Sequence, residues 1–217
     1  MLLFRPPGVY PAQGDTELLI EALRQEGPRP GTRLLDLGTG SGAVALAGAA
    51  LGAEVTAVDL SRLALASTWV NARLRHRRVR LRRGDLTDPV TSARFDLVVS
   101  NPPYVPAADA APPRRGVARA WDAGPDGRLL LDRICRQAPA VLARGGVLLV
   151  VQSSLARPRA TLAMLRRAGL AARVVAARTQ PFGPVLTARA GWLERRGIIA
   201  DGQRDETLVV IRGVRAD

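Results

Sequence analysis

The sequence predicts an α/β fold in which a doubly wound, mostly parallel sheet carries helices on both of its faces. Short apolar runs alternate with longer stretches of helical periodicity from residue 33 to about residue 170. Residues 172–177 and 207–212 are then predicted to form a terminal pair of strands. Alternation of this kind is typical of consecutive βαβ units. Four of the apolar runs lead directly into residues that could hold a ligand, namely Gly38, Asp59, Asp85 and Asn101. Ligands bind beyond the carboxyl ends of such strands, so we expect these residues to share one site.

A glycine-rich turn follows the first predicted strand. A helix over residues 15–26 comes first, and the strand at residues 33–37 then enters the turn at 38–42 and an alanine-rich helix at 43–51. Glycines let the backbone approach a ligand closely, and the helix N-terminus presents free N–H groups. The spacing is G-x-G-x-G, which differs from the G-x-G-x-x-G of the dinucleotide fingerprint. We expect cofactor contacts from Asp36, Gly38, Thr39, Gly40 and Gly42.

The second and third predicted strands also end in acids. The strand at residues 55–59 ends in Asp59, whose carboxylate could accept both hydroxyls of a ribose. The run at 79–81 leads into Asp85, which could hold an adenine amino group. A surface aspartate in an ordinary turn is the simpler explanation for either acid taken alone. The residues expected to contact the cofactor here are Asp59, Leu60, Asp85 and Leu86.

The fourth predicted strand, residues 95–100, stops in the sequence Asn101-Pro102-Pro103-Tyr104. Each proline fixes its own backbone and biases the residue before it toward extended geometry, so the segment should stand out stiffly from the strand end. The Asn101 side-chain oxygen and the Pro102 carbonyl could together accept both hydrogens of a planar NH2 group. An ordinary X-Pro-Pro loop is the structural alternative. We predict catalytic roles for Asn101, Pro102 and Tyr104, and substrate contacts from all four residues.

Together these residues resemble the class I S-adenosylmethionine-dependent methyltransferases, and among them the short HemK-type glutamine methyltransferases, whose hallmark is Asn-Pro-Pro-Tyr. The resemblance covers nearly the whole chain, is weakest over residues 178–205, and is supported by segments 9–19, 120–128 and 206–212. One departure lies at Gln13 and Gly14, where the short family usually has Ala-Glu. The lost glutamate could alter a lid or substrate contact.

The resemblance implies a seven-stranded, Rossmann-like methyltransferase fold in a single domain over residues 1–217. It also implies S-adenosylmethionine as cofactor, with Asn101 close to both cofactor and substrate. Residues 1–30 would form a lid and helix, and residues 178–205 a C-terminal insertion that could shape a different substrate pocket. The methyl acceptor would be a glutamine of a protein such as a translation release factor.

The expected chemistry is positioning of a weak nucleophile. An amide nitrogen delocalises its lone pair, whereas the sulfonium of the cofactor is strongly electrophilic. Gripping both N–H bonds would aim the lone pair, and the methylated nitrogen could release its proton to water without a general base. Tyr104 could stack on the substrate amide, with Tyr10 and Trp121 as further substrate contacts. The alternative to a substrate contact for Trp121 is a structural role, as a half-buried tryptophan beside a helix.

Composition limits the remaining possibilities. The chain has 217 residues and is 47% hydrophobic, so it can bury a substantial core. No run of about eighteen apolar residues free of charge occurs, and residues 1–4 are too short for the apolar part of a signal peptide, so we expect a cytoplasmic protein. The single cysteine, Cys135, falls at an apolar helical position and should be buried. His76 is the only histidine, so we expect no metal site.

The charge is unusual because all 32 basic residues are arginine, giving a net charge of +13. Seven arginines crowd residues 73–83, which we place at the sheet edge. They could form a solvated edge that blocks strand pairing, or a phosphate-binding surface for nucleic acid. By family resemblance, eukaryotic short HemK enzymes work with a small zinc-binding subunit that adds to a sheet edge. The arginines make that partner unfavourable here.

Four functions remain open from the sequence. Methylation of a protein glutamine is the principal hypothesis. Adenine N6-methylation of RNA or DNA is the second. An exocyclic amine fits the same pair of acceptors at Asn101 and Pro102, which we call the Asn-Pro claw, and the arginines suit a phosphate backbone. A small-molecule or peptide methyltransferase is the third. A non-catalytic cofactor-binding module is the fourth, and it would have no use for the claw.

Overall fold

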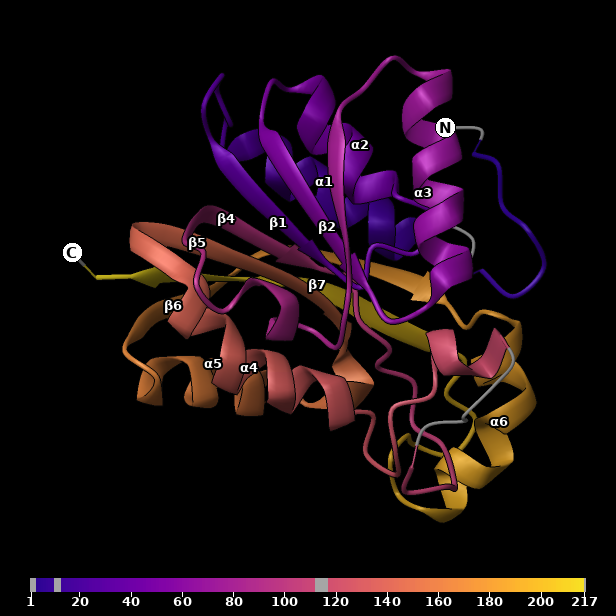
Figure 1. Cartoon of the computed structure of the whole chain (residues 1–217). Coiled ribbons are helices and arrows are strands. Elements are labelled where there is room, and N and C mark those ends of the chain that lie inside the picture. The colour runs from indigo at the N-terminus through magenta and orange to yellow at the C-terminus, as the bar shows by residue number, and fades with distance from the viewer. Residues whose placement is uncertain (1–2, 10–12, 112–116, 217) are drawn as a thin grey trace.

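The computed structural model describes residues 3–9, 13–111 and 117–216, and its centre is a seven-stranded sheet (Figure 1). The strand order is β3-β2-β1-β4-β5-β7-β6. The five strands from β3 to β5 run parallel, whereas β7 is antiparallel to both β5 and β6. The predicted doubly wound, mostly parallel sheet is therefore confirmed. The strands are β1 (Arg33–Leu37), β2 (Glu54–Asp59), β3 (Val79–Arg83), β4 (Phe95–Ser100), β5 (Leu142–Ser153), β6 (Leu170–Pro181) and β7 (Asp205–Arg215).

Helices cover both faces of the sheet. Figure 1 shows α1, α2 and α3 above the sheet and α4 and α5 below it, as two-sided winding requires. Because both faces are covered, the central strands are apolar along their length, and every residue of β4 except Asp96 is buried. The helices are α1 (Gly14–Gln25), α2 (Ala43–Ala50), α3 (Arg62–Leu74), α4 (Leu129–Val141), α5 (Pro158–Arg167) and α6 (Pro184–Arg195).

The two C-terminal strands are longer than the sequence indicates. We expected strands at residues 172–177 and 207–212, but β6 continues to Pro181 and β7 begins at Asp205. The reason is that β6 is an edge strand whose outward positions carry polar side chains, so its second half lacks an apolar run. The segment predicted as an insertion, 178–205, therefore starts inside β6. Its helix α6 joins β6 to β7 and packs in a small separate core with Phe182 and Leu155.

The sequence predicts neither a membrane span nor a metal site. Within them, no helix combines the length and apolar character needed to cross a membrane. No group of histidine, cysteine, aspartate and glutamate side chains in the same ranges could hold a metal ion.

Cys135 is 1% exposed, and burial raises the pKa of its thiol to about 11. The prediction of a buried cysteine is therefore confirmed.

Candidate functional site

A cavity of about 900 Å³ opens beyond the carboxyl ends of β1, β2, β3 and β4. Its size falls in the range of small-molecule and cofactor sites. The structure brings most of the predicted site residues together around it, although they come from four separate strand ends. The predicted residues that line it are Asp36, Gly38, Thr39, Gly40, Asp59, Leu60, Asp85, Leu86, Asn101, Pro102 and Pro103.

The glycine turn forms an open cradle on one side of this cavity. Gly38 and Gly40 have φ angles of +73° and +57°, which other residues rarely adopt. A Cβ built on either glycine would meet no atom within 4 Å, so the backbone there faces open space. Gly42 differs, because a Cβ there would lie 2.8 Å from the Thr68 side chain on α3. Gly42 therefore serves the close packing of α2 against α3, and it does not line the cavity.

Two acids, the buried Asp36 and the half-buried Asp59, organise the turn. Asp36 is 1% exposed and accepts hydrogen bonds from the Thr39 hydroxyl at 2.7 Å and the Ala45 N–H at 3.1 Å. Burial nevertheless raises the pKa of Asp36 to about 7. Asp59 accepts from the Gly40 N–H at 3.0 Å and the Ser61 N–H at 2.8 Å, and burial raises its pKa as well. Each Asp59 oxygen holds one backbone donor and retains capacity for a second.

Asp85 lies in a more polar setting than predicted. Its carboxylate forms an ion pair of 2.9 Å with Arg133 of α4, and both side chains are about one third exposed. Sequence reasoning did not identify Arg133, which also lines the cavity. The neighbouring Leu60 and Leu86 contribute apolar walls. A ligand amino group at Asp85 would therefore share the carboxylate with a guanidinium.

The first turn of α1 fixes the orientation of Asn101. The Thr16 hydroxyl donates to Asp15 Oδ1 at 3.2 Å and accepts from Asn101 Nδ2 at 3.1 Å. Because the hydroxyl proton is directed at Asp15, the amide of Asn101 must turn its NH2 group toward Thr16. Asn101 Oδ1 is then the atom available to a ligand. We call this chain of hydrogen bonds from Asp15 through Thr16 to Asn101 the α1 relay.

The aromatic residues are placed differently from the prediction. Tyr104 is 8% exposed, does not line the cavity, and donates its phenol proton to Asp15 Oδ2 at 2.9 Å. It thus supports Asp15, the first member of the α1 relay. Trp121 is half-buried and also outside the lining, and its carbonyl accepts from the Val105 N–H. Tyr10 lies outside the described residues.

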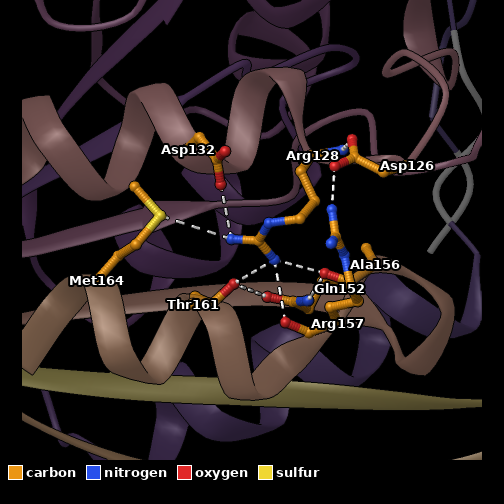
Figure 2. A network of polar contacts seen from close by, with 8 residues as sticks. All are labelled: Asp126, Arg128, Asp132, Gln152, Ala156, Arg157, Thr161 and Met164. Carbon is orange, nitrogen blue, oxygen red and sulfur yellow. Dashed lines mark hydrogen bonds and ion pairs between the residues drawn. The ribbon is translucent and has the colours of Figure 1, made fainter.

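A buried arginine holds the loop that follows the claw. Arg128 is 3% exposed and lies at the centre of the polar network in Figure 2. Its guanidinium donates to the Ala156 carbonyl, to Arg157 O at 3.0 Å and to Thr161 Oγ1 at 3.1 Å, and pairs with Asp132 at 2.6 Å. The loop is thereby fastened to the end of β5 and to α5. The segment at residues 120–128, which supports the family resemblance, thus includes an arginine with a structural role.

Comparisons with known proteins show the family to which this chain belongs. The family model described as "Methyltransferase small domain" matches residues 3–113. A Methanocaldococcus jannaschii protein named "Putative protein N5-glutamine methyltransferase" is 31% identical over 85% of this chain and 92% of its own. The release factor glutamine methyltransferase of Bordetella pertussis is 42% identical over 76% of this chain, which spans 63% of that longer protein.

Solved structures share the same fold. The Mtq2–Trm112 complex of E. cuniculi, described as responsible for methylation of the eRF1 translation termination factor, superposes with a TM-score of 0.67 at 28% identity. That match covers 96% of this chain and 99% of the other. The T. thermophilus 16S rRNA N2 G1207 methyltransferase gives a TM-score of 0.65 at 21% identity, over 98% of this chain and 47% of its own. At that identity the second likeness shows the fold alone.

Proposed function

Because the chain belongs to the methyltransferase small domain family, we propose that it methylates the side-chain amide nitrogen of a glutamine in a protein, using S-adenosylmethionine. The observation that carries this proposal is the α1 relay, which presents the Asn101 oxygen as a hydrogen-bond acceptor. An NH2 group is what such an acceptor, paired with the Pro102 carbonyl, would hold. The relatives named as glutamine methyltransferases support the same acceptor.

The residues around the cavity fit S-adenosylmethionine. The open cradle at Gly38 and Gly40 leaves room for a ligand against the backbone. Asp59 retains acceptor capacity for the two hydroxyls of a ribose, and Leu60 and Leu86 offer apolar surface for an adenine. When bound, the cofactor would supply an electrophilic methyl group on a positively charged sulfonium. Asp36, at the base of the turn, would favour such a positive charge in its ionised form.

The protein contributes orientation to the reaction. Asn101 Oδ1 and the Pro102 carbonyl would each accept one N–H of the substrate amide, which holds the nitrogen with its lone pair directed toward the methyl donor. Orientation of reacting groups can supply roughly 7–11 kcal/mol in favourable cases. The nitrogen becomes acidic once methylated, and its proton can pass to water. No side chain of the claw needs to act as a base.

The lining of the cavity favours a glutamine over a flipped adenine. Among the described lining residues none is aromatic, since Tyr104 and Trp121 both lie elsewhere. A base taken out of a stack is commonly held between aromatic or apolar side chains. A glutamine side chain needs only a narrow slot and the two acceptors. A translation release factor is the protein substrate that the named relatives suggest.

The Asn101→Ala variant tests the assignment. We expect S-adenosylmethionine affinity, measured by calorimetry, to stay near that of the wild type, because the relay faces the substrate amide. Transfer of labelled methyl to a glutamine-containing protein should fall at least a hundredfold, roughly the effect of removing one oriented hydrogen bond from a transition state. A folded variant that keeps full turnover would refute the assignment of Asn101.

A further inference from the structure

Seven arginines form a basic surface at the β3 edge of the sheet. β3 is the outermost strand on its side, pairing with β2 alone. All seven side chains are exposed except that of Arg75, which is half-buried. We call this surface the basic edge, and its members are Arg73, Arg75, Arg77, Arg78, Arg80, Arg82 and Arg83.

The acids near the basic edge balance only a small part of its charge. No acidic residue occurs in the sequence between Asp59 and Asp85. The ion pair described at this surface joins Arg80 to Glu54 at 3.8 Å, and both side chains are more than half exposed, so it contributes little. Elsewhere the protein pairs its arginines more closely, as in the 2.6 Å contact between Arg212 and Glu26. The basic edge therefore concentrates positive charge on one surface of the protein.

Protection of an open sheet edge explains only part of this arrangement. A charge on the strand itself discourages pairing with another chain, and Arg80, Arg82 and Arg83 suffice for that purpose. The other four arginines lie in the last turn of α3 or in the connection to β3. Charges placed there cannot block a backbone ladder. They extend the positive surface from the strand onto the adjoining helix.

An exposed aromatic ring adjoins the same surface. Trp69 of α3 is 53% exposed, and the Arg73 guanidinium lies 5.5 Å from the centroid of its ring. Exposed cations beside an exposed ring are the combination that single-stranded nucleic acids recognise, through phosphate contacts and base stacking. A protein strand added to β3 would have to bury the arginine side chains that flank it, whereas a polyanion neutralises them.

We propose that the basic edge binds the phosphate backbone of single-stranded RNA, with Trp69 as a stacking platform for a base. The surface adjoins the catalytic cavity, because Leu60 and Leu63 line that cavity and Arg83 donates to the Leu60 carbonyl. RNA bound there would lie next to the part of the cavity wall that Leu60 forms. The interaction requires neither cofactor nor methyl transfer, so it stands independently of the proposed function.

Fluorescence anisotropy with labelled oligouridine tests this proposal. The cluster variant replaces Arg77, Arg78 and Arg82 with glutamine. The matched control removes the same charge from exposed arginines on α5 and β6, at Arg159, Arg167 and Arg173. We expect the dissociation constant of the cluster variant to rise at least about tenfold, and the salt slope to fall by about 2, at roughly 0.7 per phosphate contact in single strands.

The Trp69→Ala variant provides a second reading, because loss of base stacking should weaken binding roughly tenfold without changing the salt slope. The control should bind oligouridine within about twofold of the wild type.

Equal weakening of the cluster variant and the control would overturn the proposal, since only net charge would then matter. A wild type that binds no oligouridine at low salt would overturn it as well. Unchanged thermal denaturation and cofactor affinity in each variant separate these outcomes from misfolding and from failure of the proposed catalysis.

Discussion

Removal of the Thr16 hydroxyl should slow methyl transfer while leaving cofactor binding intact. Thr16→Val preserves the shape of the side chain but removes the acceptor for Asn101 Nδ2 and the donor to Asp15. The site is buried, with Thr16 5% exposed, so both partners lose a hydrogen bond that water cannot readily replace. Each such loss costs about 1–3 kcal/mol. If the Asn101 amide is then free to turn, a loss of about 1.5–3 kcal/mol corresponds to a 10- to 150-fold drop in kcat.

The matched control is Thr16→Ser, which retains the hydroxyl and should keep kcat within a few-fold of the wild type. Both variants are compared by transfer of labelled methyl to a glutamine-containing substrate under saturating cofactor, and by calorimetric titration with S-adenosylmethionine. We expect a reduced kcat and unchanged cofactor affinity for Thr16→Val alone. A Thr16→Val protein that turns over like Thr16→Ser, even if less stable, would show that the α1 relay supports only the fold.

Three further outcomes are expected. Asp59→Ala should weaken S-adenosylmethionine binding by about 1.5–3 kcal/mol in calorimetry, and unchanged affinity would place the ribose elsewhere. Asp36 has its pKa raised from 3.8 to about 7, so the stability it contributes is present below pH 4 and is lost as pH rises toward 7. Asp36→Asn should therefore flatten the pH dependence of urea denaturation in that window, and an unaltered slope would contradict the cause assigned. Arg128→Leu should cost about 3–5 kcal/mol in denaturation because it leaves buried acceptors unpaired, whereas Arg157→Leu, at an exposed pair, should cost under about 1 kcal/mol. Equal losses in these two variants would refute the structural role of Arg128.

The succession of strands and helices along the chain, and the strand ends that carry ligand groups, could be predicted from the sequence. Each of these features is local, because a buried parallel strand reads as a short apolar run and its functional residue follows directly. Gly40 and Asp59 illustrate this, since two separately predicted strand ends meet in one hydrogen bond of 3.0 Å. The polar second half of β6 escaped prediction for the opposite reason, because an edge strand needs no continuous apolar run.

The α1 relay could not be read from the sequence. Thr16 and Asn101 are separated by 85 residues, and Asp15 and Tyr104 by 89, so no local pattern joins them. The local signal was a pair of small polar residues opening an amphipathic helix, which is equally typical of a helix start. The orientation of the Tyr104 side chain could not be predicted either, because two prolines fix the backbone before it but do not determine its rotamer.

The identity of the methylated atom tests the central claim most directly. The purified protein is incubated with S-adenosylmethionine labelled at its methyl group and with cell extract, and protein is then separated from nucleic acid. Hydrolysis and mass spectrometry of each fraction identify the labelled product. Methyl transfer to the amide held by Asn101 predicts N5-methylglutamine in the protein fraction, lost in the Asn101→Ala variant. Label recovered as N6-methyladenine in the nucleic acid fraction would contradict the claim.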